Sequence, residues 1–209
     1  KIDYAIQKKP DGLADAFLIA EKFVANHHSA LILGDNLFHV EHFSRKIDNA
    51  CKQKKGCSIF LYRVSDPHRY GIVELDSNNK ITSIVEKPSK PKNNMAVTGL
   101  YFYDDTVTER VKQLSISERG ELEITDLNKS YLKEDQLNYQ LLSRGSVWLD
   151  TGTVDSLHEA SSYIRTIEKR QGLKVGCPEE IAWRLGWIDD NKLEYLASNI
   201  TNSGYGNYL

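Results

Sequence analysis

The hydrophobic positions of this chain follow two periodicities, and each predicts a different kind of element. Leu13, Phe17, Ala20 and Val24 recur at the spacing of an amphipathic helix. Short apolar runs bounded by turn residues are typical of strands. They predict strands at 2–6, 31–33, 57–64, 70–75, 81–85, 96–103, 137–142 and 146–149. Helical spacing predicts helices at 13–24, 40–51, 106–114, 121–132 and 153–170, with two short ones beginning near 177 and 189.

The order of these elements predicts an α/β fold. The chain opens as strand, loop, helix and strand, which is the crossover unit of a parallel sheet. Residues 76–79 then close a hairpin, and helices gather after residue 152. The continuous apolar run of residues 30–33 is typical of a fully buried strand. We therefore expect a three-layer α/β/α sandwich around a mixed sheet.

Composition narrows the function classes. A chain of 209 residues that is 40% hydrophobic can bury a sizeable core. Its net charge of −2 favours neither nucleic acid nor an anionic membrane, and no stretch approaches the ~20 apolar residues of a membrane-spanning helix. Cys51, Cys57 and Cys177 are odd in number and form no C-x-x-C pair, so we expect free thiols and a cytoplasmic location.

Two acidic residues each follow an apolar run. Residues 30–33 lead through Gly34 to Asp35, and residues 147–149 lead to Asp150. Ligands of α/β sheets bind at the carboxyl ends of strands, and Mg²⁺ is usually held by one or two carboxylates plus substrate phosphates. An aspartate that merely caps a turn after a strand is the alternative. The recurrence of the pattern favours a shared metal site.

Three further places could carry chemistry. Gln7, followed by Gly12 in a turn, could contact the edge of a pyrimidine base, although a turn with a helix cap explains the same residues. Glu86 and Lys87 could bind sugar hydroxyls and a phosphate, and Arg119 permits the same interpretation. Surface ion pairs at turns are the alternative for these residues. Spacing alone does not decide between the interpretations.

Other motifs are missing or incomplete. The sequence contains no G-x-S-x-G, Walker A or Rossmann G-x-G-x-x-G motif, which argues against the corresponding hydrolases, kinases and dehydrogenases. His39 and His42 stand at helical spacing, but no cysteine or acid completes a zinc set.

Several long stretches together resemble one family, the sugar-1-phosphate nucleotidylyltransferases, and within it the members that use dTTP and glucose 1-phosphate. The stretches are QKKPDGLADAF, LILGDNLF, DPHRYGIVELD, IVEKPSKPKNN, AVTGLYFYD, RGELEITDLN, VWLDTGT and RQGLKVGCPEEIAWR. The resemblance implies a mainly parallel, Rossmann-like sheet. It also implies a single nucleotidyltransferase domain over residues 1–209, with a C-terminal helical part at 153–209.

The resemblance also assigns roles to individual residues. It implies that Asp35 and Asp150 bind Mg²⁺ and that Lys87 holds the sugar phosphate, which makes these three the catalytic set. It places Gln7 and Gly12 at the nucleotide base, and Trp148 as a pocket aromatic beside the second acid. Arg119 is placed near the phosphates. The implied sugar contacts are Tyr70, Gly71, Glu86, Val97 and Tyr101.

The implied reaction transfers a thymidylyl group from dTTP to glucose 1-phosphate, giving dTDP-glucose and pyrophosphate for deoxysugar and cell-surface polysaccharide synthesis. Family resemblance further implies a homotetramer with a dTDP-sugar as effector. The family's glycine-rich N-terminal signature is absent here, so we expect an N-terminally truncated fragment of low activity.

Three rivals remain open at this stage. A UTP-dependent uridylyltransferase would read the same pyrimidine edge, and a non-catalytic nucleotide-sugar-binding homologue would need no triphosphate loop. A glycosyltransferase of the GT-A type fits less well, because Asp35 is followed by Asn36-Leu37 rather than by x-Asp.

Overall fold

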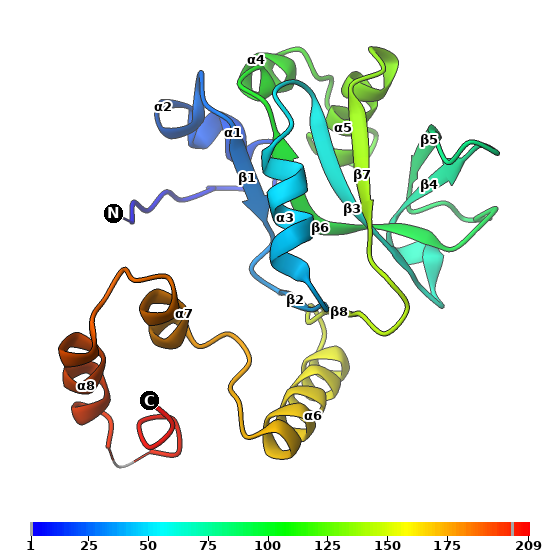
Figure 1. The fold of residues 1–209 in the computed structure, drawn as a ribbon. Coiled ribbons are helices and arrows are strands. Elements are labelled where there is room, and N and C mark those ends of the chain that lie inside the picture. Colours follow the sequence, from blue (N-terminus) through cyan, green and yellow to red (C-terminus); the bar gives the residue numbers. More distant parts are fainter. Residues whose placement is uncertain (1, 202) are drawn as a thin grey trace. The chain divides into compact units, whose positions relative to one another are not determined.

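The computed structural model describes residues 2–201 and 203–209, and the chain divides into two compact units, 1–148 and 149–209 (Figure 1). Each unit is described by itself. The first unit holds the sheet and the helices that cover it, and the second is helical. The expectation of a single nucleotidyltransferase domain with a helical part at 153–209 stays a prediction.

The first unit is organised around a six-stranded sheet with the order β5-β4-β6-β3-β7, in which β1 also pairs with β6. The strands are β1 (Ser29–Ile32), β3 (Cys57–Arg63), β4 (Gly71–Leu75), β5 (Ile81–Glu86), β6 (Met95–Tyr103) and β7 (Leu137–Leu141). Within the described residues, β3 and β7 run parallel, whereas β6 is antiparallel to β1, β3 and β4, and β4 is antiparallel to β5. The mixed sheet is confirmed, and the expectation of a mainly parallel one is corrected.

Alternating side chains divide the core into two layers, one on each face of the sheet. On β3, Ile59 and Leu61 join one buried cluster and Phe60 joins the other. The first cluster packs under α1 (Ala16–Ile19), α2 (Glu21–Val24), α4 (Val107–Lys112) and α5 (Ile124–Lys133). The second packs against α3 (Phe43–Cys51) and the small sheet of β2 (Asn36–His39) and β8 (Val147–Asp150). The three-layer α/β/α prediction is therefore confirmed.

The beginning of the chain departs from the prediction. Residues 2–6 form no strand, and Ile2, Tyr4 and Ile6 are exposed, because no described strand offers them a hydrogen-bonding partner. The strand β1 is not fully buried either: its exposure alternates, and Ile32 is 57% exposed. It pairs antiparallel with β6, so the described residues contain no parallel crossover unit at this point.

Two local details also differ from the sequence prediction. The helix expected over 13–24 is split into α1 and α2 at Ala20. The short strand β2, between β1 and α3, was not predicted. The β4–β5 hairpin, by contrast, forms as expected, with Gly71 opposite Glu86, and a short 3₁₀ turn at Pro67–Arg69 precedes it.

The second unit contains α6 (Val154–Gln171), α7 (Pro178–Arg184) and α8 (Asp190–Ser198). Thr153 and Ser156 form a capping box at the start of α6, and Gly172, with φ +70°, ends it. Near the C-terminus, Tyr205 donates a hydrogen bond to Glu179, which joins the last residues to α7. None of the helices in the described parts of the chain is long and apolar enough to cross a membrane.

Candidate functional site

Five residues from four elements meet at one end of the β4–β5 hairpin, and we call them the Glu86 cluster. They are Gly71 on β4, Glu86 on β5, Val97 and Tyr101 on β6, and Thr125 on α5. A Cβ atom on Gly71 would lie 3.2 Å from Thr125 Oγ1 and 3.3 Å from Glu86 Oε2. The glycine therefore lets the backbone of β4 approach this carboxylate closely, and the hydroxyl of Thr125 fixes the carboxylate by donating a hydrogen bond to Oε2.

The surroundings of Tyr101 in the Glu86 cluster determine its protonation state. Burial raises the pKa of Tyr101 well above its ordinary value, and the negative charge of Glu86 raises it further. Tyr101 is only 4% exposed and therefore keeps a neutral hydroxyl at physiological pH. The cluster offers a carboxylate and apolar walls, which together suit a polyhydroxylated ligand such as a sugar.

Arg119 lies beside the Glu86 cluster, among carboxylates. Its guanidinium is 3.3 Å from Glu123, 3.5 Å from Glu121 and 3.9 Å from Glu86. Its side chain remains 46% exposed, so these pairs are screened by water. Arg119 is thus near the residues predicted to bind the sugar, and its placement near phosphates stays a prediction.

Lys87 follows Glu86 at the end of β5 with an unusual backbone. Its φ is +40°, a value that non-glycine residues rarely adopt, and its backbone N–H donates a 3.0 Å hydrogen bond to the carbonyl of Tyr70. Its side chain is exposed. Backbone strain of this kind persists where neighbouring contacts hold it, and it is common at functional sites.

A second group of residues surrounds Asn36, and we call it the Asn36 junction: Asp35, Asn36, Gly99 and Trp148. Oδ1 of Asn36 accepts hydrogen bonds from the Trp148 indole (2.6 Å) and from the Gly99 amide (3.0 Å), while its Nδ2 donates to Asp35 Oδ1 (2.8 Å). A Cβ atom on Gly99 would lie 2.7 Å from Asn36 Cγ, so a larger residue there would displace the Asn36 side chain. Asn36 therefore orients the carboxylate of Asp35.

Trp148 also takes part in an aromatic wall. Its ring centre lies 5.0 Å from that of Tyr70 and 6.0 Å from that of Tyr62. Because the carbonyl of Tyr70 accepts the hydrogen bond from Lys87, this wall connects the Asn36 junction with the end of β5. The predicted residues Tyr70, Lys87 and Trp148 are therefore close neighbours.

The loop of residues 7–12 is fixed to the segment that carries Arg119. The amide of Leu122 donates a 2.7 Å hydrogen bond to the carbonyl of Asp11. Gly12, with φ +104°, packs directly on the backbone of Leu122, where a Cβ atom would lie 2.7 Å from the amide nitrogen. Gln7 donates from Nε2 to the carbonyl of Gly12 (3.0 Å) and to Asp15 Oδ2 (2.9 Å). These contacts fix the loop in the fold, and a base contact stays a prediction.

The two predicted metal ligands belong to different units. Asp35 is exposed and directly precedes β2 in the first unit, and Asp150 is the last residue of β8 in the second. Oδ1 of Asp150 accepts a 3.0 Å hydrogen bond from the amide of Gly152, as a turn-capping aspartate does. Within the described residues, no group of three or more His, Cys, Asp or Glu side chains forms a metal cluster.

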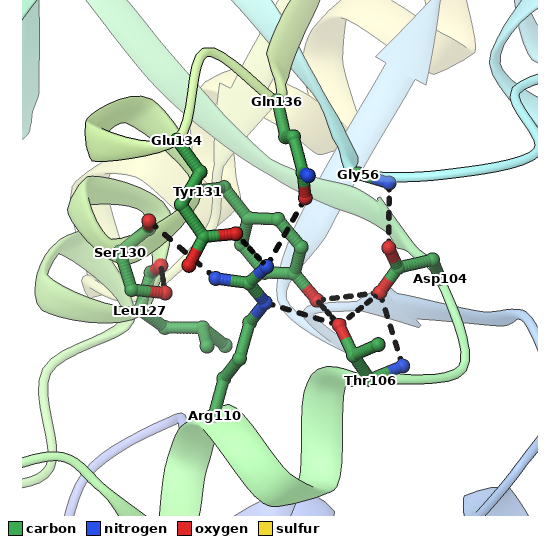
Figure 2. Close-up of polar contacts among 9 residues, drawn as sticks. All are labelled: Gly56, Asp104, Thr106, Arg110, Leu127, Ser130, Tyr131, Glu134 and Gln136. Atoms are coloured by element: carbon green, nitrogen blue, oxygen red, sulfur yellow. Dashed lines mark hydrogen bonds and ion pairs between the residues drawn. The ribbon is translucent and has the colours of Figure 1, made fainter.

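A polar network fastens α4 and α5 to the sheet (Figure 2). Asp104, at the end of β6, accepts hydrogen bonds from the amides of Gly56 and Thr106 and from the hydroxyls of Thr106 and Tyr131. Although burial would raise the pKa of Asp104, these hydrogen bonds lower it overall. Arg110 covers the ring of Tyr131 and pairs with Glu134 at 2.6 Å. Because Tyr131 and Thr125 share α5, the network helps to hold Thr125 against Glu86.

Sequence reasoning missed three residues that organise these groups: Asp15, Asn36 and Thr125. Their partners lie 8 residues away for Asp15, 39 for Thr125 and 112 for Asn36. No periodicity or local motif encodes such contacts. The one available signal was the position of Asn36 directly after Asp35.

With this geometry established, comparisons with known proteins identify the class. The sequence matches the nucleotidyl transferase family over residues 1–167. Because that match covers more than half of the chain, the chain belongs to the nucleotidyl transferase family.

The relatives identify a particular member of that family. A glucose-1-phosphate thymidylyltransferase of Neisseria meningitidis is 50% identical over 208 residues, a match that covers 100% of this chain and 72% of that protein. An enzyme with the same name from Xanthomonas campestris is 51% identical and is covered to 70%. The chain thus spans about seven-tenths of the length of these curated relatives.

Solved structures agree on the fold. A Bacillus anthracis protein assigned as a glucose-1-phosphate thymidylyltransferase, crystallised with sucrose, superposes with a TM-score of 0.70 at 41% identity. The match covers 77% of this chain and 64% of that one. A UDP-glucose pyrophosphorylase bound to UDP-glucose gives a TM-score of 0.68 at 23% identity, which indicates a shared fold only.

Proposed function

We propose that this protein is a glucose-1-phosphate thymidylyltransferase, which converts dTTP and glucose 1-phosphate into dTDP-glucose and pyrophosphate. The observation that carries the proposal is the Glu86 cluster, in which a carboxylate fixed by Thr125 lies close to the bare backbone of Gly71. It suits a hexose, and relatives about half identical over the whole chain have this name. The product would supply deoxysugar and cell-surface polysaccharide synthesis.

The chemistry demands positioning and charge neutralisation. The attacking group is a phosphate oxygen of glucose 1-phosphate, which is already an anion, so no general base is needed. Glu86 would accept hydrogen bonds from sugar hydroxyls, and Tyr70, Gly71, Val97 and Tyr101 would line the sugar. Lys87 would bind the sugar phosphate, which brings its oxygen into line with the α-phosphorus of dTTP. Pyrophosphate then leaves from the opposite side.

The nucleotide would be held elsewhere. Gln7 and Gly12 would contact the base, Trp148 would border the pocket, and Arg119 would lie near the phosphates. For each of these residues the support is its match to a family motif together with its place in the fold.

A divalent cation is expected in this family, and we propose Mg²⁺ on Asp35 and Asp150. The donors fit, since both offer carboxylate oxygens, and Asn36 orients Asp35 by a hydrogen bond to Oδ1. The lack of a three-ligand cluster among the described residues also fits, because Mg²⁺ takes its remaining ligands from water and phosphates. When bound, the ion would neutralise charge on the phosphates.

Steady-state pyrophosphate release by the full-length protein tests the proposal. With glucose 1-phosphate as acceptor, we expect kcat/KM for dTTP to exceed that for UTP, and omission of the sugar phosphate serves as the control. A preference for UTP would instead favour a uridylyltransferase. If neither dTTP nor UTP gives pyrophosphate release, a nucleotide-sugar-binding homologue without turnover is favoured.

We further propose a cytoplasmic homotetramer with a dTDP-sugar effector. The three cysteines are free thiols, which suits a reducing compartment. In the second unit, Leu157, Trp183, Leu185 and Trp187 are large exposed apolar residues that could contact other subunits. Sedimentation with and without dTDP-rhamnose would test both the assembly and the effector.

A further inference from the structure

The side chain of Gln7 is held in one orientation by two acceptors. Its Nε2 lies 3.0 Å from the carbonyl oxygen of Gly12 and 2.9 Å from Oδ2 of Asp15. A carbonyl and a carboxylate can only accept hydrogen bonds, so the group that faces them must be the NH₂ end of the amide. The orientation therefore follows from chemistry and does not depend on telling nitrogen from oxygen.

Both hydrogens of this amide are consequently in use. Among residues 2–201 and 203–209, no hydrogen bond to Oε1 of Gln7 is found. The end of Gln7 left for a ligand is an acceptor, which pairs with a donor such as the N3–H of thymine or uracil. Cytosine presents an acceptor at N3, so the two lone pairs would oppose each other there.

Of the two hydrogen bonds that the Gln7 amide donates, the one to Asp15 is the stronger. A hydrogen bond to a carboxylate is stronger than one to a neutral carbonyl. The side chain of Asp15 makes no capping hydrogen bond to α1, although Asp15 precedes that helix. Its observed partner is instead the amide of Gln7.

We propose that Asp15 is a positioning residue that locks the Gln7 amide with its oxygen toward the base, so that the site selects pyrimidines bearing an N3–H. The inference rests on the proposed function, in which Gln7 contacts the base. It makes no distinction between thymine and uracil, because both carry the N3–H donor. The discrimination falls between dTTP or UTP on one side and dCTP on the other.

The test compares Asp15→Ala, Asp15→Asn and the control Asp11→Ala in the full-length protein, with dTTP, UTP and dCTP as nucleotides. Asp11 is an exposed acid on the same loop, and its variant removes the same charge without touching Gln7. We expect Asp15→Ala to lower the dTTP/dCTP ratio of kcat/KM about tenfold while the dTTP/UTP ratio stays constant. Asp15→Asn, which keeps one acceptor oxygen, should fall between Asp15→Ala and wild type.

The outcomes separate the two proposals. If wild type uses dTTP and Asp15→Ala keeps the wild-type dTTP/dCTP ratio, or if Asp11→Ala changes it equally, the role of Asp15 is wrong and the proposed function stands. If wild type releases no pyrophosphate from dTTP, the proposed function fails instead. A readout without activity is the Gln7 side-chain amide in NMR: slow hydrogen exchange that Asp15→Ala accelerates supports the lock, and fast exchange in wild type overturns it.

Discussion

The indole nitrogen of Trp148 donates a 2.6 Å hydrogen bond to Oδ1 of Asn36, although the two residues are 112 positions apart. The same oxygen accepts from Gly99, and the other end of the Asn36 amide holds Asp35. One side chain thus connects the buried sheet, an aromatic wall and a proposed metal ligand. Its substitution should affect both stability and activity.

Asn36→Ala should lower the free energy of unfolding by about 2–3 kcal/mol, because the indole and the Gly99 amide each lose a partner in a partly buried site. Asn36→Asp keeps the accepting oxygens but replaces the donor to Asp35 with a second carboxylate, which repels that of exposed Asp35. We expect Asn36→Asp to retain most of the stability and to shift the Mg²⁺ dependence of activity. Urea unfolding and Mg²⁺ titrations measure the two effects, and equal behaviour of the two variants would contradict this account.

Gly71→Ala should weaken the binding of glucose 1-phosphate and leave the fold nearly intact. The new Cβ would stand 3.2–3.3 Å from Thr125 Oγ1 and Glu86 Oε2, a distance that small side-chain shifts accommodate. We expect a loss of stability below about 1 kcal/mol and a rise in KM for glucose 1-phosphate of about tenfold, with KM for dTTP unchanged. An unchanged KM for the sugar phosphate would show that the Glu86 cluster does not bind it.

Gly12→Ala should destabilise the protein by about 2–4 kcal/mol, since φ is +104° and the added Cβ would meet the backbone of Leu122. Gly34→Ala is the matched control, because no atom lies within 4 Å of its added Cβ. The control should change stability by less than about 0.5 kcal/mol. Thermal or urea unfolding of both variants distinguishes this structural role of Gly12 from a role in base contact alone.

Asp104 should make the free energy of unfolding depend on pH. Its pKa is lower in the folded protein than in the unfolded chain, so its contribution is complete above the ordinary carboxyl pKa near 4 and is lost as pH falls through the folded value. Asp104→Asn should cost about 2–4 kcal/mol at pH 7, and the difference from wild type should shrink toward pH 3. Urea midpoints between pH 7 and 3 measure it, with the exposed neighbour Asp105→Asn as control. A difference that does not vary with pH would refute the role of the charge.

Asp150→Asn should reduce the rate of pyrophosphate release far more than it reduces stability. The variant keeps an oxygen for the turn with Gly152 but removes a carboxylate from the proposed metal site. Asp155→Asn, an exposed acid in the first turn of α6, controls for the loss of charge. Near-normal turnover of Asp150→Asn with Mg²⁺ would rule out Asp150 as a metal ligand.

The sequence by itself determined most of the elements and the family. Period-two and helical spacings marked the β4–β5 hairpin, β3, β6 and α5, and the signals of Thr153 and Gly172 marked both ends of α6. These features are local, because a turn, a cap or an amphipathic face depends on residues a few positions apart. Local motifs also sufficed to choose the candidate site residues.

Tertiary structure decided which segments became neighbours. Residues 2–6 have the alternating pattern of a strand but no described pairing partner, and β1 joins β6 antiparallel along an exposed edge. The hydrogen bonds of Thr125 to Glu86 and of Trp148 to Asn36 depend on the packing of separate elements. Strand pairing and buried polar contacts gain their free energy between distant parts of the chain, so no local pattern records them.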